Sequence, residues 1–243
     1  MQYWHLSDPG SVRSTNQDVC LVENLDKNTL LCVVCDGMGG AKSGNVASGL
    51  AMDVFAQEMR NCWKGDLDSE KFKTALQSAV KLVNFTVYDQ AQQFSEFAGM
   101  GTTLVAAIVQ PKKAVVVNVG DSRAYRINAK GITQITQDHS LVQMMVDRGE
   151  MTPEQAKTNP SKNLITRAIG TESMVECDMF HVKLEKGDCM LLCSDGLTNL
   201  MDDQEILFEV VHGQQLEDCC QRLLDIAKRR GAPDNVTSIL VNV

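Results

Sequence analysis

The 243-residue sequence is long enough for one large domain or two small ones, and its 44% hydrophobic content can supply a substantial core. The formal net charge of −8 and the pI near 5.0 argue against nucleic acid as a partner. No apolar run approaches the roughly 20 residues that a bilayer-spanning helix needs, so no membrane contact is expected. The N-terminal residues lack a basic region followed by an apolar one, and we therefore expect no signal peptide.

Strands and helices can be predicted along the chain from hydrophobic spacing. Short apolar runs rich in β-branched residues predict strands, and residues 1–18 are expected to form an edge strand and then a loop that carries Arg13 and Asp18. Longer segments with apolar residues at helical spacing predict helices. Strands are expected at about 19–25, 30–35, 103–109, 114–119, 123–127, 132–135, 177–184, 188–193 and 236–242. Helices are expected at about 44–62, 69–93, 202–211 and 214–230.

The spacing of these elements indicates how they are arranged. Two long consecutive helices with a short connection predict an antiparallel pair lying on a sheet, and the closely spaced strands after residue 103 predict antiparallel hairpins. Residues 138–165 are polar and helix-prone and contain Pro153 and Pro160. A long insertion of this kind between strands is typical of a lid or binding loop. No repeat or linker is evident, so we expect a single domain over 1–243.

Aspartates lie at the ends of five predicted strands. The apolar run Leu30–Cys35 closes on Asp36, and the glycines that follow allow tight turns and a close approach to a ligand. A single aspartate at a strand end is commonly a turn residue. Five of them are harder to explain as turns, because strand ends in one sheet can converge and bring their side chains together. Oxygen-only clusters suit magnesium or manganese, and two such ions about 4 Å apart form a phosphoryl-transfer or hydrolysis site. The other aspartates of this set are Asp18, Asp121, Asp195 and Asp234.

The nine cysteines are interpreted as structural. Cys32 and Cys35 form a Cys-x-x-Cys inside a predicted strand, where residues three apart lie on opposite faces. This weakens both a zinc and a redox interpretation. Cys189 and Cys193 share a face and are expected to act as small core hydrophobes. Reduced cysteines fit a cytoplasmic protein.

Eight short motifs follow one another along essentially the whole chain. Taken together, they make the sequence resemble the metal-dependent PP2C-type (PPM) Ser/Thr protein phosphatases, most closely their compact bacterial form. The motifs are Arg13 with Asn16-Gln17-Asp18, Asp36-Gly37-Met38-Gly39-Gly40, Met100-Gly101-Thr102-Thr103, Gly120-Asp121-Ser122-Arg123-Ala124-Tyr125, Asp138-His139-Ser140-Leu141, Thr166-Arg167-Ala168-Ile169-Gly170, Ser194-Asp195-Gly196-Leu197 and Pro233-Asp234-Asn235-Val236-Thr237.

This resemblance implies an α+β fold, a four-layer α-β-β-α sandwich in which two packed antiparallel sheets are flanked by helices, with metals in a cleft at one end. It also implies a ligand set for two tightly bound Mn²⁺ or Mg²⁺ ions. Asp36 would bridge both ions and the carbonyl of Gly37 would bind one of them, while Asp195 and Asp234 would bind the other. Asp18 would orient metal-bound waters.

Further roles follow from the same resemblance. Asp121, with Asp195, corresponds to the site of a third, weaker ion, and residues 138–165 correspond to the family's flap. Arg13 corresponds to the phosphate-binding arginine, which can hold two oxygens bidentately. The implied reaction is hydrolysis of phosphoserine and phosphothreonine by a hydroxide that bridges the two metals, with Asp36, Asp18 and Arg13 as the catalytic residues.

One position departs from the family pattern. Bacterial relatives often carry a histidine after the Gly-Gly pair, where it is a candidate general acid, but this chain has Ala41 followed by Lys42. His139 belongs to the motif at the start of the flap and is interpreted as structural. A metal-bound water could protonate the leaving alkoxide instead, so the identity of the general acid stays open.

The resemblance implies a phosphoric monoester hydrolase that acts in signalling by dephosphorylation. It also implies that the enzyme is cytoplasmic and monomeric. Its implied partners are phosphorylated Ser/Thr proteins and a cognate Hanks-type Ser/Thr kinase. The alternative is a non-catalytic PPM-like sensor or interaction domain, but every acidic ligand position is filled. A calcium-binding module is a third option, and the sequence lacks its dense Asp-x-Asp-x-Asp-Gly loop.

Overall fold

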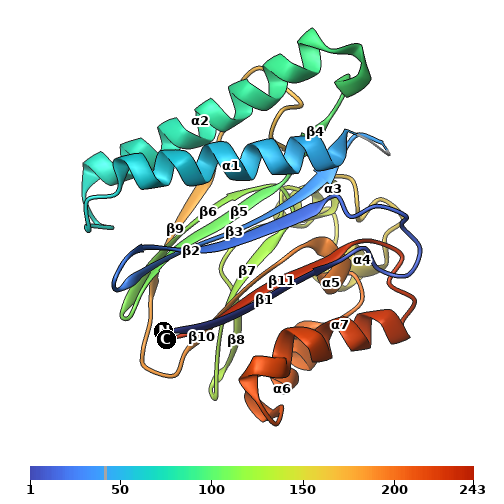
Figure 1. Ribbon diagram of the computed structural model, residues 1–243. Coiled ribbons are helices and arrows are strands. Elements are labelled where there is room, and N and C mark those ends of the chain that lie inside the picture. Colours follow the sequence, from blue (N-terminus) through green and yellow to red (C-terminus); the bar gives the residue numbers. More distant parts are fainter. Residues whose placement is uncertain (41–42) are drawn as a thin grey trace.

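Two antiparallel β-sheets packed face to face form the centre of the molecule (Figure 1). The computed structural model describes residues 1–40 and 43–243. Sheet A has the order β1 (Gln2–Asp8), β11 (Val236–Asn242), β10 (Cys189–Cys193), β7 (Arg123–Asn128) and β8 (Gly131–Gln134). Sheet B has the order β2 (Asp18–Asp26), β3 (Thr29–Met38), β5 (Leu104–Gln110), β6 (Lys113–Val119) and β9 (Asp178–Lys183), and β4 (Gly101–Thr102) pairs with β3.

The run Leu30–Cys35 of strand β3 is apolar because both of its faces are buried. Leu31, Val33 and Cys35 belong to the core between sheet B and its helices, whereas Cys32 and Val34 belong to the core between the two sheets. The predicted placement of Cys32 and Cys35 on opposite faces is therefore confirmed. Cys189 and Cys193 both lie in the core on the helix side of sheet A, which confirms that they share a face.

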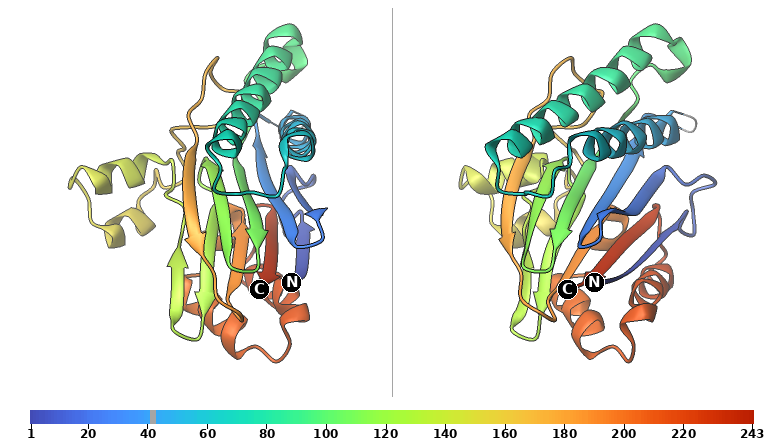
Figure 2. Two further views of the ribbon diagram at one scale, coloured as in Figure 1. Left: turned by 90° about the vertical axis from the view of Figure 1, so that its left-hand side faces the viewer. Right: turned by 60° about the vertical axis from the view of Figure 1, so that its left-hand side comes forward.

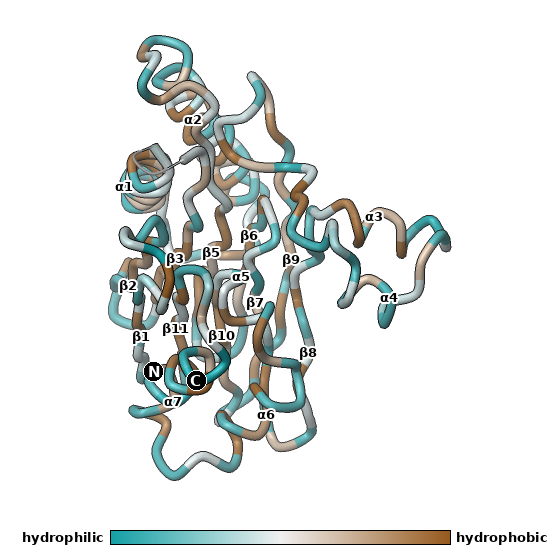
Figure 3. The backbone as a smooth tube through the Cα atoms, turned by 90° about the vertical axis from the view of Figure 1, so that its right-hand side faces the viewer, coloured by the Kyte–Doolittle hydropathy of each residue, from teal (hydrophilic) through white to brown (hydrophobic). Residues whose placement is uncertain are grey.

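Helices cover the outer face of each sheet. The antiparallel pair α1 (Gly44–Cys62) and α2 (Glu70–Gln93) lies on sheet B, and α6 (Asp203–His212) and α7 (Cys219–Arg229) lie on sheet A (Figure 1). Figure 3 shows hydrophobic residues concentrated along the strands between these helical layers. The resulting order of layers is α-β-β-α, so the expected fold class is confirmed.

The flap, residues 138–165, carries two short helices, α3 (Leu141–Asp147) and α4 (Pro153–Thr158). Figure 2 shows this yellow segment projecting sideways from the sheets. Its two ends are joined where the backbone N–H of Thr166 donates to the carbonyl of His139 at 2.7 Å. Only Val142 is buried among the residues of its two helices, so few apolar contacts hold the flap against the rest of the molecule.

The observed elements differ from the predicted ones mainly at short segments. The helix predicted over 214–230 begins only at Cys219, because Gln215 is extended and a single 3₁₀ turn, Leu216–Asp218, precedes α7. The short helix α5 (Asp195–Thr198) was not expected, since four residues are too few to show a helical repeat. In the described ranges, no helix has both the length and the hydrophobicity that a bilayer crossing requires.

Candidate active site

The five strand-end aspartates come together at the end of the sheets opposite to the chain termini (Figure 1). Asp18 opens β2 and Asp36 lies near the end of β3, and the two are direct cross-strand partners. Asp195 follows β10 and Asp234 precedes β11, so both lie at the adjoining end of sheet A. Asp121 follows β6 and reaches the group from another strand. The predicted convergence of the aspartates therefore occurs.

The backbone of Asp36 is fixed by two threonines of the Gly101-Thr102-Thr103 segment. Thr102 Oγ1 donates to the Asp36 carbonyl at 2.9 Å. The Asp36 N–H donates to Thr103 Oγ1 at 3.0 Å, and the Thr103 N–H donates back to the Asp36 carbonyl at 2.9 Å. Thr103 Oγ1 also lies 2.7 Å from the hydroxyl of Ser122. Hydroxyl groups thus connect Asp36 to the loop that carries Asp121.

Gly37 is a glycine because the start of α1 packs directly against it. A Cβ at this position would lie only 2.1 Å from the carbonyl oxygen of Gly44. The Gly37 N–H donates to the carbonyl of Gln17 at 3.1 Å, and Ser48 Oγ on α1 donates to the same carbonyl at 2.6 Å. The N-terminal loop, the Asp36-Gly37 turn and helix α1 are therefore held together at one point.

Asp18 is nearly inaccessible to solvent, with 4% of its surface exposed. Its Oδ2 accepts from Ser194 Oγ at 2.7 Å, while Oδ1 is buried without a protein partner. Burial raises the pKa of the Asp18 carboxyl to about 6, with a smaller contribution from the charge of Asp195. Ser194 is itself fixed, because its Oγ accepts from the backbone N–H of Thr237 at 3.1 Å.

The other carboxyl groups are affected in the same direction. Burial, and then the charges of the neighbouring aspartates, raise the pKa of Asp36 well above its usual range. Burial, followed by the charge of Asp195, raises the pKa of Asp121 to about 8. Burial and the charge of Asp234 also raise the pKa of Asp195, whose Oδ2 accepts from Asn199 Nδ2 at 2.8 Å.

These residues fit hard divalent cations. Carboxylate and carbonyl oxygens are the ligands that Mg²⁺ and Mn²⁺ prefer, and like charges held this close require a compensating cation to be fully ionised. The unpartnered Oδ1 of Asp18 is a further acceptor without a donor. Within residues 1–40 and 43–243, no three Asp, Glu, His or Cys side chains are close enough together to coordinate one metal ion as they stand.

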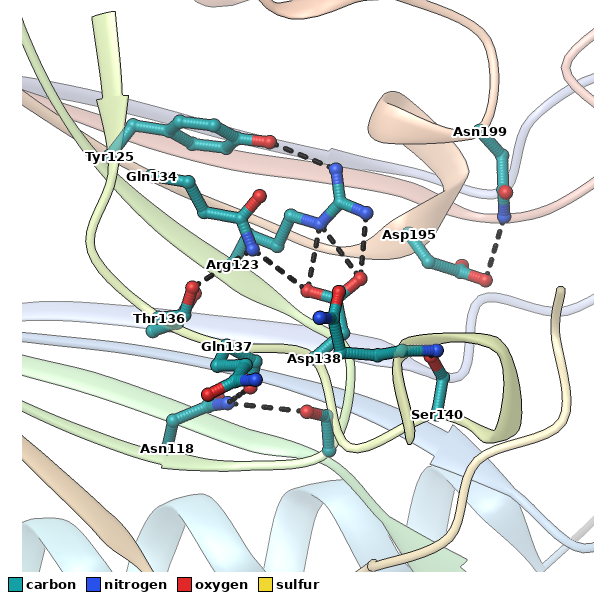
Figure 4. Close-up of polar contacts among 12 residues, drawn as sticks. Asn118, Arg123, Tyr125, Gln134, Thr136, Gln137, Asp138, Ser140, Asp195 and Asn199 are labelled. Carbon is teal, nitrogen blue, oxygen red and sulfur yellow. Dashed lines mark hydrogen bonds and ion pairs between the residues drawn. The ribbon is translucent and has the colours of Figure 1, made fainter. Parts of the chain in front are cut away.

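A cleft opens beside Asp121 and Asp195, between the flap and the segment 198–205. The cavity has a volume of about 520 Å³ and is also lined by Lys157 and Lys162 of the flap. Its floor contains a partly buried ion pair in which the guanidinium of Arg123 binds both oxygens of Asp138 at 2.6–3.0 Å (Figure 4). Tyr125 and Gln134 add hydrogen bonds to this pair. Since Asp138 begins the flap, the pair attaches the flap to sheet A.

Arg13 lies at the edge of the carboxylate group. Its Nη2 donates to Asp234 Oδ2 at 2.9 Å, and about half of its side chain, 53%, is exposed. The guanidinium is therefore accessible from solvent at the edge of the carboxylate group. The pair is solvent-accessible on both sides, and such pairs add little to the free energy of unfolding.

His139 is structural, as expected from its motif. Its Nδ1 accepts from the backbone N–H of Gly120 at 3.0 Å, and its Nε2 lies 3.2 Å from Asp178 Oδ2. Burial lowers the pKa of this imidazole. Its Nε2 also lies 2.9 Å from Arg167 Nη1, which itself contacts Asp178. Ala41, the position at which relatives often carry a histidine, lies outside the described residues.

Sequence reasoning did not assign roles to several polar residues that hold the aspartates in place. All but Asn199 lie within a motif that was recognised, and Gln17, Ser122, Ser194 and Asn235 are adjacent to an aspartate in the sequence. The residues of this group bind backbone, carboxylate or hydroxyl groups of the site. They are Gln17, Thr102, Thr103, Ser122, Ser194, Asn199 and Asn235.

Comparison with known proteins identifies the family. Residues 11–240 match the Protein phosphatase 2C family, and the chain belongs to that family. It is 38% identical over 239 residues to the serine/threonine phosphatase stp of Listeria innocua, an alignment that covers 97% of this chain and 93% of the relative.

Solved structures agree with this assignment. The fold matches the serine/threonine phosphatase Stp1 from Staphylococcus aureus with a TM-score of 0.93 at 39% identity, over 100% of this chain and 95% of the other. It also matches the catalytic domain of the serine/threonine protein phosphatase PstP, solved with two manganese ions, with a TM-score of 0.85 at 34% identity. That match covers 99% of this chain and 97% of the other.

The raised pKa of Asp36 leads to a prediction about stability. In metal-free buffer, Asp36→Asn should unfold at a higher temperature than the wild type at pH 8, because the amide removes a buried charge that its neighbours repel. A carboxyl whose pKa is raised on folding lowers stability above its unfolded pKa of about 4 and has no such effect below it. The difference in melting temperature should therefore shrink toward pH 4. Thermal unfolding followed by circular dichroism, with and without Mn²⁺, measures it.

Manganese provides the control for this prediction. Mn²⁺ should raise the melting temperature of the wild type, since it binds only the folded state, and it should raise that of Asp36→Asn much less. A variant that is less stable than the wild type at pH 8 without metal would show that Asp36 is not under electrostatic strain.

Proposed function

We propose that this chain is a metal-dependent protein serine/threonine phosphatase that hydrolyses phosphoserine and phosphothreonine. The observation that carries this conclusion is the meeting of five aspartates from both sheets beside an open cleft. Membership of the Protein phosphatase 2C family supports it. The relatives are named serine/threonine phosphatases, and no observation favours the alternative of a non-catalytic interaction domain.

In the proposed site, two divalent ions are held by Asp36 together with the carbonyl of Gly37, Asp195 and Asp234. Bound ions of this kind acidify water and neutralise charge on phosphate. Asp36 lies opposite Asp18 and close enough to Asp195 to be affected by its charge, and its carboxylate would be shared by both ions. Asp18 accepts from Ser194 on one oxygen and keeps the other free to orient water.

Arg13 is proposed to bind the phosphate group of the substrate. Its planar guanidinium can donate to two phosphate oxygens at once, and its partner Asp234 lies at the edge of the site. The Cys35 thiol, next to Asp36 in the chain, is buried, and burial raises its pKa, so we propose that it takes no part in the chemistry. His139 is engaged at both ring nitrogens, and we propose that a water protonates the leaving alkoxide.

Asp121 is proposed to hold a third, weakly bound ion together with Asp195, and the flap is proposed to contact the peptide around the phosphorylated residue. The cleft between the flap and α5 opens directly onto these two aspartates. The proposed partners are phosphorylated Ser/Thr proteins and a cognate Hanks-type kinase. We further propose that residues 1–243 act as a single PPM domain, monomeric and cytoplasmic, using Mn²⁺ or Mg²⁺.

The direct test of the function is metal-dependent hydrolysis of p-nitrophenyl phosphate and of a phosphothreonine peptide. Activity should require Mn²⁺ or Mg²⁺ and disappear with a chelator. Asp36→Asn should retain less than about a tenth of the wild-type turnover, a loss of more than about 1.4 kcal/mol in transition-state stabilisation, because an amide holds two cations poorly. A folded Asp36→Asn variant with higher turnover would exclude the bridging role, and a wild type inactive with either metal would favour the interaction-domain alternative.

Arg13→Ala should raise the KM for phosphopeptides more than it lowers kcat. The reason is that a guanidinium binds phosphate in both the ground state and the transition state, which is mostly uniform binding. Steady-state kinetics at saturating Mn²⁺ measure both parameters. Arg229→Ala, which removes an exposed arginine on α7, is the matched control and should behave as the wild type. A fall in kcat at unchanged KM would show that Arg13 acts on the transition state alone.

Asp121→Ala should keep two tightly bound ions and lose most activity on phosphopeptides. An ion held by few carboxylates and mostly by water is weakly bound, so its loss does not disturb the other two. Elemental analysis after gel filtration gives the metal content, and turnover is followed across a manganese titration. Asp225→Ala, at an exposed position on α7, is the control. Full phosphopeptide activity in Asp121→Ala would contradict the third-ion assignment.

A further inference from the structure

The side chain of Asn235 binds the loop that carries Arg13. Asn235 is buried, with 4% of its surface exposed, at the start of β11. Its Oδ1 accepts from the backbone N–H of Gln17 at 2.8 Å. Its Nδ2 donates to the carbonyls of Pro9 at 3.0 Å and Thr15 at 3.1 Å. Both amide hydrogens and the amide oxygen are thus used, and all three bonds go to backbone groups of one loop.

These contacts lie on both sides of Arg13 in the sequence. The loop 9–17 has no helix or strand of its own, so its conformation depends on such bonds. The Ser11 N–H donates to the carbonyl of Ala232 at 2.8 Å, and a Cβ at Gly10 would lie 2.2 Å from the carbonyl oxygen of Asp234. The loop is therefore packed tightly against the turn before β11, and Asn235 supplies most of its polar contacts there.

Asn235 also acts on the carboxylate that Arg13 contacts. The backbone N–H of Asn235 donates to Asp234 Oδ1 at 2.9 Å, while Arg13 donates to Asp234 Oδ2 at 2.9 Å. One residue thus orients the carboxylate through its backbone and the arginine loop through its side chain. A side chain that only filled the core would need neither the amide nor its three backbone partners.

We infer that Asn235 is a positioning residue, which holds loop 9–17 so that Arg13 stays beside Asp234 and faces the phosphate of the substrate. The inference rests on the proposed phosphate-binding role of Arg13. Asn235 itself does not touch the substrate. Its contribution is to order the arginine before binding, which lowers the entropy lost when the phosphate is bound.

A double-mutant cycle with Asn235→Ala and Arg13→Ala tests this inference. Asn235→Ala should raise both the KM for p-nitrophenyl phosphate and the inhibition constant of inorganic phosphate by about tenfold, with kcat changed less than about threefold. In the Arg13→Ala background, the same substitution should change either constant by less than about twofold, because residues that act through one another are not additive. Equal effects in both backgrounds would overturn the positioning role.

Two further measurements separate this role from a general loss of structure. Metal content after gel filtration should stay at two ions in Asn235→Ala, since the backbone bond to Asp234 is retained; loss of an ion would show that Asn235 acts on the metal site instead. Asn242→Ala is the matched control, because this asparagine ends the same strand and its Nδ2 lies 3.3 Å from Cys189 Sγ, within sheet A. It should have wild-type kinetics.

The outcomes for the two proposals differ. If Arg13→Ala alone leaves KM and phosphate inhibition unchanged, the phosphate-binding role fails, and the positioning role fails with it. If Arg13→Ala has its expected effect but the cycle is additive, only the positioning role fails. If Asn235→Ala does not fold, Asn235→Ser can replace it. The shorter serine side chain also loses the contacts with Pro9 and Thr15 but stays polar. The double-mutant cycle of Asn235→Ser with Arg13→Ala then distinguishes the same two outcomes.

Discussion

Repulsion between buried aspartates is the interaction on which the rest of this structure depends. Asp18 and Asp36 face each other directly across the β2–β3 ladder, an arrangement of like charges that lowers the stability of a sheet. It persists because apolar cores on both sides of each sheet stabilise the strands independently of the site. Hydroxyl and amide groups then fix each acid separately: Thr102 and Thr103 hold the backbone of Asp36, and Ser194 binds Asp18. Binding of a cation would relieve the electrostatic repulsion between these aspartates, which the fold tolerates without it.

The helices, the strands and the aspartate group could be predicted well from the sequence, because each depends on a local pattern of residues. The run Leu30–Cys35 has no polar interruption, and this identifies a strand buried on two faces. The strand-end position of Asp36 or Asp195 is equally visible. Contacts between distant segments leave no such pattern. Nothing in the residues around Asn235 indicates that its side chain binds Pro9 and Thr15, more than 200 positions earlier, and the register that places Asp18 opposite Asp36 follows from pairing, not from composition.

The sandwich also explains where the flap is attached. The flap begins at Asp138, which is bound by Arg123 of sheet A, and it ends beside His139, which is bound to Gly120 and faces Asp178 of sheet B. Its base is therefore fixed to both sheets, next to Asp121. Its helices, by contrast, bury little beyond Val142 and have few contacts that would resist displacement. Because the base is fixed and the tip is loosely held, displacement of the tip need not move the carboxylates.

The site combines residues from both ends of the chain, and this has a consequence for assembly. Arg13 lies in the first loop and Asp18 directly follows it as the first residue of β2, whereas Asp234 and Asn235 precede the last strand. They meet only when β1 has paired with β11, the contact of greatest sequence separation in sheet A. Loop closure of this length is costly and slow compared with the local hairpins β2–β3 and β5–β6. We therefore expect the aspartates of sheet B to be placed within their own sheet before the full cluster of like charges forms. The unfavourable charge contacts should then form late in folding, when the apolar cores can offset them.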